Sequence, residues 1–274
     1  MTAPSVARVD IGKLSIGPEL GRGRHGKIAA VNGLLLRRKW AAAVKIYWPD
    51  VLRELDGAAL EQIAALPGTL ALQDGRWIGE NTTWPVVLAE RAGAVCGFLM
   101  RAVPSEYSYP GDSYLDGPHV GIPDAERLRM LQSLAMALAR LHEIGAVVGD
   151  LSPRNVLFSY GSPARCLLTG CDAFQLNGQT ALGQVETTGW EVPVGETKTT
   201  MASDAYKFGL LAIRLLARDP KGRDESAISG VSAELGRLAR LSQHLDPMRR
   251  PAARAWIGPL DQAARSVELY GRCG

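Results

Sequence analysis

The sequence predicts an α+β protein with two lobes, a small β-rich lobe over residues 16–104 and a larger, mainly helical lobe over residues 105–274. Short apolar runs broken by Gly, Pro and Asn dominate the first part, whereas apolar residues at helical spacing dominate the second. A stretch rich in Gly, Pro, Ser and Tyr over residues 105–123 separates the two patterns and is typical of a connecting loop. Residues 1–15 are expected to form an N-terminal tail, and a cleft is expected between the lobes.

The first lobe is expected to contain two β-hairpins and a single helix. Asn32-Gly33, a strong signal for a tight turn, separates two apolar runs, and Ala92-Gly93 lies between two others. Apolar residues between 51 and 66 have helical spacing, and Pro67-Gly68 is expected to end that helix. The expected strands are 27–31, 34–38, 41–47, 84–90 and 95–103.

The second lobe is expected to consist mostly of helices. Apolar residues recur at intervals of three and four from Leu128 to Leu141, which predicts a long helix that Asp124 can cap and that Gly145 ends. We find no internal repeat. The further expected helices are 202–218, 233–244 and 252–269.

The composition excludes several classes of protein. The 31 Lys and Arg residues exceed the 28 Asp and Glu residues by only three, which is too few to indicate nucleic acid as the main partner. No apolar run reaches the roughly 20 residues that a membrane span requires, and the N-terminus has no signal-peptide pattern. The four cysteines lack zinc-binding spacing and are expected to be reduced thiols. We therefore expect a cytoplasmic protein that binds neither nucleic acid nor membrane.

Three glycines, Gly21, Gly23 and Gly26, have the spacing G-x-G-x-x-G. Glycine at these positions lets the backbone approach a phosphate group closely, although the same residues also fit an ordinary β-turn. A strand rather than a helix is expected after Gly26, which argues against the dinucleotide-binding fingerprint, because that fingerprint opens a helix. Lys45 follows within the apolar run Ala43-Val44-Lys45-Ile46. A lysine in a buried strand either extends its ammonium group to water or pairs with an anion.

Three polar residues of the second half could carry chemistry. Asp150 and Asn155 follow the long helix, where a carboxylate could accept the proton of an attacking hydroxyl group and an amide oxygen could bind a metal ion. Asp172 follows the short apolar run Leu167-Leu168 and could chelate Mg²⁺. A polar turn is the alternative for each residue. Their occurrence together favours the metal-binding interpretation.

The order of these motifs resembles that of the protein kinase family. The segment from Ser203 to Gly209 resembles the opening of the kinase helix that anchors the catalytic loop, and Arg250-Pro251 resembles the Arg-Pro pair before the last kinase helices. The resemblance runs from about Ile16 to Leu260 and implies the two-lobed protein-kinase-like fold. The form of the Asp150 and Asp172 motifs is similar to that of a divergent group of bacterial kinase-like proteins.

The resemblance implies a role for each candidate residue, with ATP and Mg²⁺, or Mn²⁺, as cofactors. The lysine of this family pairs with a carboxylate on the next helix, and we favour Glu61 over Glu54, which lies on the same helical face. The implied catalytic residues are Asp150, Lys45 and Glu61, and the implied metal ligands are Asn155 and Asp172. The residues expected to contact ATP are Gly21, Gly23, Gly26, Ile28, Lys45, Met100, Arg101 and Val103.

The sequence departs from the family pattern around the catalytic residues. Gly149 replaces the Arg that precedes the catalytic Asp, which puts control by a phosphorylated activation loop in doubt. Ser152 replaces a Lys that would neutralise the transferred phosphate. Ala173-Phe174 replaces the Phe-Gly of Asp-Phe-Gly, so the metal ligand remains but the glycine hinge is lost. Thr187 or Thr188 could supply the threonine of the substrate-docking loop.

A further departure concerns the end of the activation segment. Val192-Pro193-Val194 stands where the family has Ala-Pro-Glu and therefore lacks the glutamate. Arg250, the usual partner of that glutamate, would then need another acid, and Glu191 and Glu196 are the candidates.

Three functions are compatible with these residues. The first, which we favour, is an active serine/threonine protein kinase that uses ATP and Mg²⁺ on a protein substrate. The second is a pseudokinase, a nucleotide-binding or partner-docking module that acts on a partner in trans. The third is a small-molecule kinase resembling aminoglycoside or choline phosphotransferases, and Asp204 together with Arg250-Pro251 argues against it.

Overall fold

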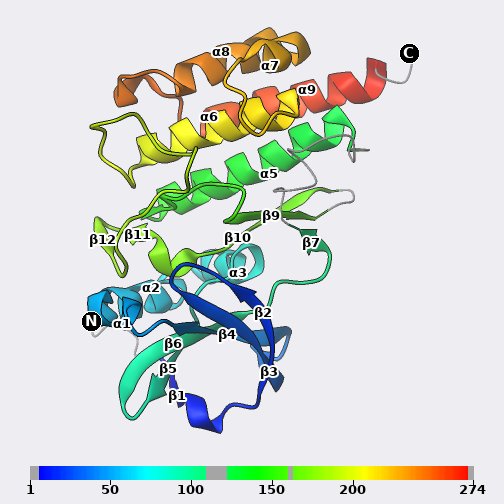
Figure 1. Cartoon of the computed structure of the whole chain (residues 1–274). Helices are drawn as coiled ribbons and strands as arrows, with labels where there is room; N and C mark the ends of the chain where they lie inside the picture. The colour runs from blue at the N-terminus through cyan, green and yellow to red at the C-terminus, as the bar shows by residue number, and fades with distance from the viewer. Residues whose placement is uncertain (1–5, 109–121, 160–162, 271–274) are drawn as a thin grey trace. The chain divides into compact units, whose positions relative to one another are not determined.

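The computed structural model describes residues 6–108, 122–159 and 163–270, and the chain forms two compact units (Figure 1). Unit 1 contains Met1–Pro104 and Leu168–Gly183, and unit 2 contains Ser105–Leu167 and Gln184–Gly274. The α+β class is as expected, with a β-sheet lobe followed by a mainly helical lobe. The later segment Leu168–Gly183, which carries one of the candidate metal ligands, belongs to the sheet-containing unit.

Unit 1 is built on a six-stranded sheet with the order β1-β5-β6-β4-β3-β2 (Figure 1). Neighbouring strands are antiparallel except for β1 and β5, which are parallel. Apolar residues of the central strands, such as Val44, Ala89 and Leu99, are buried in its core. The strands are β1 (Arg8–Asp10), β2 (Ile16–Arg22), β3 (Gly26–Leu36), β4 (Trp40–Tyr47), β5 (Val87–Arg91) and β6 (Ala94–Arg101).

Two predictions for this sheet are wrong. The predicted tail over residues 1–15 contains β1 and the short 3-10 helix η1 (Ile11–Lys13), which join the sheet through β5. The predicted turn at Asn32-Gly33 is instead an irregularity inside β3, because a bulge accepts an extra residue without ending a strand. The chain turns after Leu36, where Arg37 and Arg38 have positive φ. The second hairpin, with Ala92-Gly93 at its turn, is confirmed.

The described residues of unit 1 form three α-helices rather than the predicted single helix over 51–66. The predicted helix is interrupted before α2, where the Asp56 carboxylate caps the new helix by accepting the N–H of Ala59 at 3.0 Å. We missed α3 because its sequence is largely polar and offers few periodic apolar residues. The helices are α1 (Val51–Glu54), α2 (Gly57–Thr69) and α3 (Leu72–Asn81).

Pro67 lies inside α2 instead of ending it. Proline has no N–H group, so the carbonyl group of Ile63 loses its helical donor. The indole Nε1 of Trp84 donates to that carbonyl oxygen at 2.6 Å, and Trp84 is buried. A tertiary hydrogen bond therefore replaces the lost helical one, and the helix continues past the proline to Thr69.

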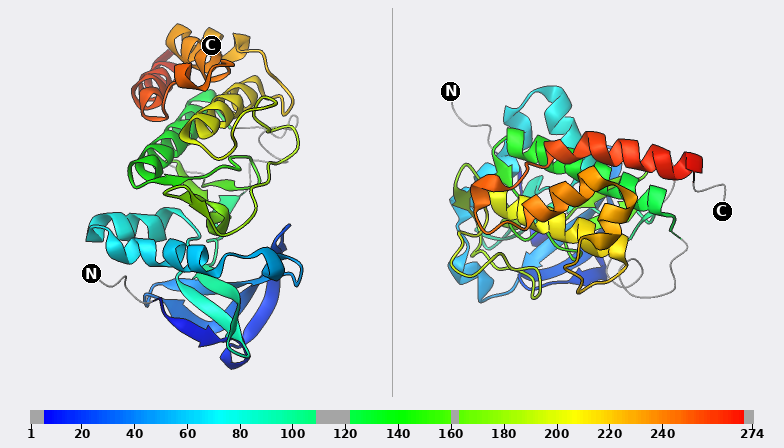
Figure 2. Two further views of the ribbon diagram at one scale, coloured as in Figure 1. Left: turned by 90° about the vertical axis from the view of Figure 1, so that its left-hand side faces the viewer. Right: turned by 90° about the horizontal axis from the view of Figure 1, so that it is seen from above.

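Unit 2 is mainly helical, and α5, α6 and α9 lie side by side in it (Figures 1 and 2). An edge-to-face contact between Phe208 and Trp256, with ring centroids 5.1 Å apart, joins α6 to α9. The predicted helices are confirmed, whereas α7 was not predicted, and Asp124 lies in the first turn of α5 rather than capping it. The helices are α5 (Asp124–Glu143), α6 (Met201–Ala217), α7 (Ser226–Val231), α8 (Ala233–Ser242) and α9 (Arg254–Tyr270). No helix in the described ranges is long and apolar enough to cross a membrane.

Short strands hold the two segments that carry candidate site residues. In unit 2, β8 (Ala146–Val147) and β9 (Val156–Ser159) flank the segment 148–155, and β9 lies between β7 (Tyr107–Ser108) and β10 (Arg165–Leu168). In unit 1, the 3-10 helix η2 (Cys171–Ala173) precedes the hairpin of β11 (Gln175–Leu176) and β12 (Gln179–Thr180). Two backbone hydrogen bonds attach this second segment to unit 1: Thr83 N donates to Leu168 O at 2.9 Å, and Asp56 N donates to Ala181 O at 3.0 Å.

Candidate functional site

The candidate residues of unit 1 centre on a buried ion pair between Lys45 and Asp172. Lys45 lies on β4 and Asp172 on η2, and Lys45 Nζ is 2.6 Å from Asp172 Oδ2. Only 1% of Asp172 is exposed, so both charges are largely removed from water. The lysine therefore pairs with an anion rather than extending to solvent, which resolves the alternative that the sequence left open.

A third residue, Tyr47, completes this group. Its hydroxyl donates a hydrogen bond to Asp172 Oδ2 at 3.0 Å. Burial, and after it the charge of Asp172, raise the pKa of the Tyr47 hydroxyl well above its usual value. The hydroxyl therefore keeps its proton and acts as a donor. No motif in the sequence indicates Tyr47, although its position two residues after Lys45 on a strand places both side chains on one face of the sheet.

The predicted pairing of Lys45 with Glu61 is wrong. Glu61 lies on α2 and pairs with Arg8 at 2.8 Å, and the same guanidinium group binds Glu90 at 2.7 Å. Arg8 reaches both carboxylates because β1 pairs with β5 at the edge of the sheet. The alternative, Glu54, is exposed and forms no ion pair with Lys45. The only carboxylate that the described residues place on Lys45 is Asp172.

Asp172 fits a metal ion. Its Oδ2 atom accepts hydrogen bonds from Lys45 and Tyr47, whereas its Oδ1 atom is buried and has no hydrogen-bond partner among the described residues. A buried carboxylate oxygen without a partner costs free energy, because it has lost its hydrogen bonds to water. Mg²⁺ prefers oxygen ligands, so a metal ion could satisfy this atom. Phe174, two residues after Asp172, makes an edge-to-face contact with Trp84, with ring centroids 5.9 Å apart, and so helps to hold the segment that carries Asp172.

Cys171, the neighbour of Asp172, is a structural residue in this geometry. The side chain is buried and its Sγ donates to Leu168 O at 3.5 Å. Burial, with a smaller contribution from the Asp172 charge, raises the pKa of the Cys171 thiol to about 12. The thiol is therefore neutral at physiological pH and is not a reactive thiolate.

The glycine loop connects β2 to β3. Gly26 is required by packing, because a Cβ atom there would lie 2.2 Å from Ile46 O, whereas a Cβ on Gly21 would meet no atom within 4 Å. Gly23 N donates to Gly26 O at 2.9 Å and closes the loop. Trp48 Nε1 donates to Gly23 O at 3.1 Å, which ties the loop to the end of β4. Only Gly21 and Gly23 therefore leave space beside the backbone for a ligand.

The other predicted ATP contacts lie on the strands next to Lys45. Ile28 is the cross-strand neighbour of Lys45 on β3, and Met100 is a buried residue of β6 opposite Ala43. The Arg101 guanidinium group donates to Glu80 O and lies over the ring of Trp40, so its side chain is already engaged. For Ile28, Met100, Arg101 and Val103, contact with ATP stays a prediction.

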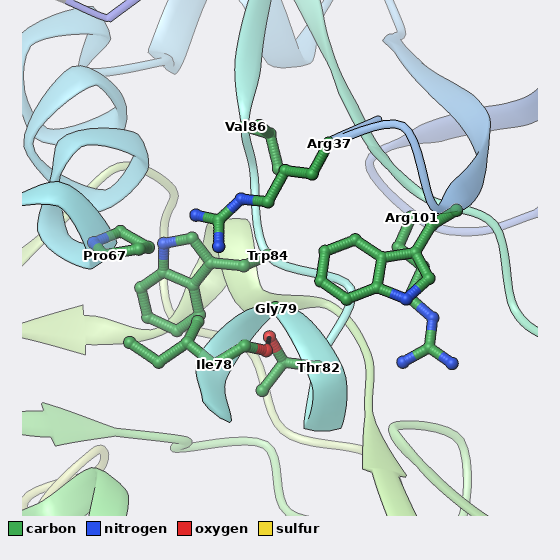
Figure 3. A pocket seen from close by; sticks show the side chains of 9 residues that line it. Arg37, Pro67, Ile78, Gly79, Thr82, Trp84, Val86 and Arg101 are labelled. Atoms are coloured by element: carbon green, nitrogen blue, oxygen red, sulfur yellow. Dashed lines mark hydrogen bonds between the residues drawn. The ribbon is translucent and has the colours of Figure 1, made fainter. Parts of the chain in front are cut away.

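A small pocket of unit 1 lies elsewhere and is not this site. Figure 3 shows the side chains of Arg37, Ile78 and Trp84 around it. Among the predicted ATP-binding residues, only Arg101 lines it. The glycine loop, Lys45 and Asp172 take no part in it. This pocket therefore gives no support to nucleotide binding.

The candidate residues of unit 2 centre on the Asp150 carboxylate. Thr187 donates to both of its oxygens, from the backbone N to Oδ1 and from Oγ1 to Oδ2, each at 2.9 Å. Asn155 Nδ2 donates to Asp150 O at 2.8 Å and to Asp150 Oδ2 at 2.9 Å. Both of these side-chain hydrogen bonds use the Asn155 amide nitrogen, so the amide oxygen is the atom that could bind a metal ion. Neutral donors thus orient Asp150 without neutralising its charge.

Asp204 holds the segment before Asp150 in place. This buried carboxylate accepts the backbone N–H groups of Val148 and Gly149 at 2.9 Å each, and it contacts His142 Nε2 at 2.9 Å. Gly149 has φ +74°, and a Cβ atom there would lie 2.7 Å from Thr199 Cγ2. The glycine that replaces the family's arginine is therefore required by this backbone conformation.

Two further residues of this region were missed. Lys207 on α6 is fully buried, and its Nζ donates to Gly149 O at 2.5 Å and pairs with Glu186 at 2.8 Å. Glu186 also accepts the N–H of Val192 at 3.0 Å. A lysine within an apolar helix is the sequence signal that could have indicated this pair, because a buried ammonium group needs an anion.

The predicted partner of Arg250 is confirmed as Glu196. The guanidinium group binds both carboxylate oxygens of Glu196 at 2.6 Å and lies over the ring of Tyr206. The other candidate, Glu191, instead accepts the N–H of Gly189. The Val-Pro-Val segment lacks the glutamate of the family pattern. Glu196, two residues after this segment, supplies the acid instead.

Comparisons with known proteins show which proteins this chain resembles. No family model matches the sequence. Serine/threonine-protein kinase pkn2 of Myxococcus xanthus is 34% identical over 185 residues, which cover 63% of this chain and 19% of that protein. Serine/threonine-protein kinase/endoribonuclease IRE1 of Oryza sativa subsp. japonica is 28% identical over 99 residues, which cover 33% of this chain and 11% of that protein. The chain therefore spans about a fifth or less of the length of these relatives.

A solved structure supports the fold. The PknI kinase domain of Mycobacterium tuberculosis, crystallised as a double mutant, matches with a TM-score of 0.64 and 17% sequence identity. The match covers 96% of this chain and 100% of that domain. It shows the same architecture, a β-sheet lobe followed by a mainly helical lobe.

Proposed function

We propose that the chain is a member of the protein kinase superfamily and an ATP- and Mg²⁺-dependent serine/threonine protein kinase, which its similarity to pkn2 and its protein-kinase fold support. The observation that carries this proposal is the Asp172 carboxylate, which is held through one oxygen by Lys45 and Tyr47 and is bare at the other. A buried acid with an unsatisfied oxygen beside a buried lysine is suited to a metal–phosphate ligand.

The residues of unit 1 bind and orient the nucleotide in this proposal. The Lys45 ammonium group holds oxygens of the ATP phosphates, and the backbone at Gly21 and Gly23 approaches them closely. Asp172 supplies an oxygen ligand for Mg²⁺ in this proposal. Asn155, the other predicted metal ligand, belongs to unit 2. The bound ion supplies neutralisation of the phosphate charge.

Asp150 acts on the substrate hydroxyl group in this proposal. Among the described residues, the Asp150 carboxylate accepts side-chain hydrogen bonds from the neutral residues Thr187 and Asn155, and it can accept a proton from a serine or threonine hydroxyl of a protein substrate. Thr187 and Asn155 fix the orientation of this carboxylate, so that little reorganisation is needed before the proton moves.

A pseudokinase that binds nucleotide and docks a partner protein is the second candidate. Two observations favour it. Ser152 lies in place of a lysine and contacts Thr187 Oγ1 at 3.1 Å, so a cation near the transferred phosphate is missing. Glu61 pairs with Arg8, so no helix among the described residues places a carboxylate on Lys45. Both candidates share nucleotide binding and differ in phosphate transfer.

Thermal unfolding combined with a transfer assay separates these candidates. ATP with Mg²⁺ at about 100 times its dissociation constant is expected to stabilise the protein by roughly 2.7 kcal/mol, because ligand binds only the folded state. The variant Lys45→Met should lose most of this stabilisation. Labelled phosphate should pass from ATP to the chain itself or to a generic protein substrate. Stabilisation without transfer would favour the pseudokinase, and no stabilisation of the wild type would contradict both candidates.

A further inference from the structure

Two donors converge on one oxygen of Asp172 and leave the other oxygen bare. Lys45 Nζ lies 2.6 Å and Tyr47 Oη 3.0 Å from Oδ2, whereas Oδ1 is buried without a partner in the described part of the chain. A carboxylate held at one oxygen by a single donor can rotate about its Cβ–Cγ bond. A second donor on the same oxygen restricts that rotation and fixes which oxygen is presented.

We propose that Tyr47 is a positioning residue that orients Asp172 so that Oδ1 is available to the metal ion of a metal–nucleotide complex. This inference rests on the proposed function, because it assigns Tyr47 to the same nucleotide site. Groups that hydrogen-bond to a ligating carboxylate orient it and tune its affinity for the metal.

The position of Tyr47 supports this role. Tyr47 follows Lys45 by two residues on β4, so both side chains reach Asp172 from the same face of the strand. Its ring is buried and lies against Phe98, with centroids 6.0 Å apart, which fixes the direction of the hydroxyl group. The packing therefore delivers the hydroxyl to Asp172 rather than leaving it to water.

No helix in the described part of the chain places a carboxylate on Lys45, which makes this second donor more important. The helix glutamate that could have steadied Lys45 is bound to Arg8 instead. Asp172 is therefore the carboxylate that the described residues place on Lys45, whose Nζ atom also lies 5.5 Å from the centroid of the Tyr47 ring and 5.8 Å from that of the Phe98 ring. Tyr47 is the described group that holds Asp172 independently of the lysine.

The variant Tyr47→Phe tests the proposal, because it removes the hydroxyl and keeps the ring and its packing. The affinity of the protein–ADP complex for Mn²⁺ is expected to fall by about 10- to 100-fold. Electron paramagnetic resonance of the free ion measures this affinity. Binding of ADP in the presence of EDTA is expected to stay within about twofold of the wild type, since Lys45 remains. Tyr206→Phe, which removes a hydroxyl bonded to Arg223 in unit 2, should change neither affinity.

A double-mutant cycle separates positioning from a general loss of structure. In the background of Asp172→Asn, Tyr47→Phe should have little further effect on Mn²⁺ affinity, because the oriented carboxylate is already gone. Equal Mn²⁺ affinity in wild type and Tyr47→Phe would overturn the inference and leave the proposed function intact. A wild-type protein that binds no ADP with or without Mn²⁺ would overturn both.

Discussion

Replacing Asp150 with asparagine is expected to slow phosphate transfer by about 10²- to 10⁴-fold. The amide has almost the same shape as the carboxylate, and its oxygen can still accept the N–H of Thr187, whereas its nitrogen cannot accept the hydrogen bond from Asn155 Nδ2. It cannot accept the proton of a substrate hydroxyl group. ATP binding should remain unchanged, because Asp150 is not among the residues assigned to the nucleotide. The measurement is the initial rate of transfer of labelled phosphate at saturating ATP.

A matched replacement controls for the loss of one negative charge. Asp246 is exposed and accepts the N–H of Met248, a role that asparagine also fills well, so Asp246→Asn should transfer phosphate at the wild-type rate. An unchanged rate in Asp150→Asn would show that Asp150 is not the base, and the kinase proposal would lose its central residue.

Replacing Arg250 with leucine is expected to lower the free energy of unfolding by about 3–5 kcal/mol. The Arg250 side chain is fully buried, and it binds both oxygens of Glu196 at 2.6 Å and the carbonyl oxygen of Ala202 at 3.1 Å. The leucine variant would leave the buried Glu196 carboxylate without its cation, which is the costly part of breaking a buried pair. Urea-induced unfolding followed by circular dichroism measures this change.

An exposed ion pair provides the comparison. Arg237 binds Glu234 through two hydrogen bonds, but both side chains are about half exposed, so Arg237→Leu should leave the unfolding midpoint almost unchanged. The double variant Arg250→Leu with Glu196→Leu should recover part of the lost stability. If Arg250→Leu unfolds at the same urea concentration as Arg237→Leu, the Arg250–Glu196 pair does not stabilise unit 2 as described.

The sequence predicted those features that depend on neighbours along the chain. Helices α5, α6, α8 and α9 follow from apolar spacing, and the β5–β6 hairpin follows from its glycine turn. The chemistry of Asp150 and Asn155 lies within six consecutive residues, so its geometry is local. The need of Arg250 for an acidic partner also followed from the sequence, because the segment Val192-Pro193-Val194 lacks the glutamate of the family's Ala-Pro-Glu.

The features that the sequence did not predict depend on contacts between residues that are far apart along the chain. Arg8 lies 53 positions before Glu61 and takes its carboxylate only because β1 pairs with β5. Asp172 reaches Lys45 across a separation of 127 positions. The path of α2 through Pro67 depends on the indole of Trp84, which no local propensity can anticipate.

Nucleotide binding that depends on a metal ion is the central claim, and isothermal titration calorimetry tests it most directly. ATP titrated into the wild-type protein with Mg²⁺ should bind at one site per chain, and its affinity should fall strongly when EDTA replaces Mg²⁺. Asp172→Ala should show a much smaller difference between ATP affinity with Mg²⁺ and ATP affinity with EDTA, because one of the two proposed metal ligands is gone. Identical wild-type affinities under both conditions, or no heat of binding in either, would contradict the account.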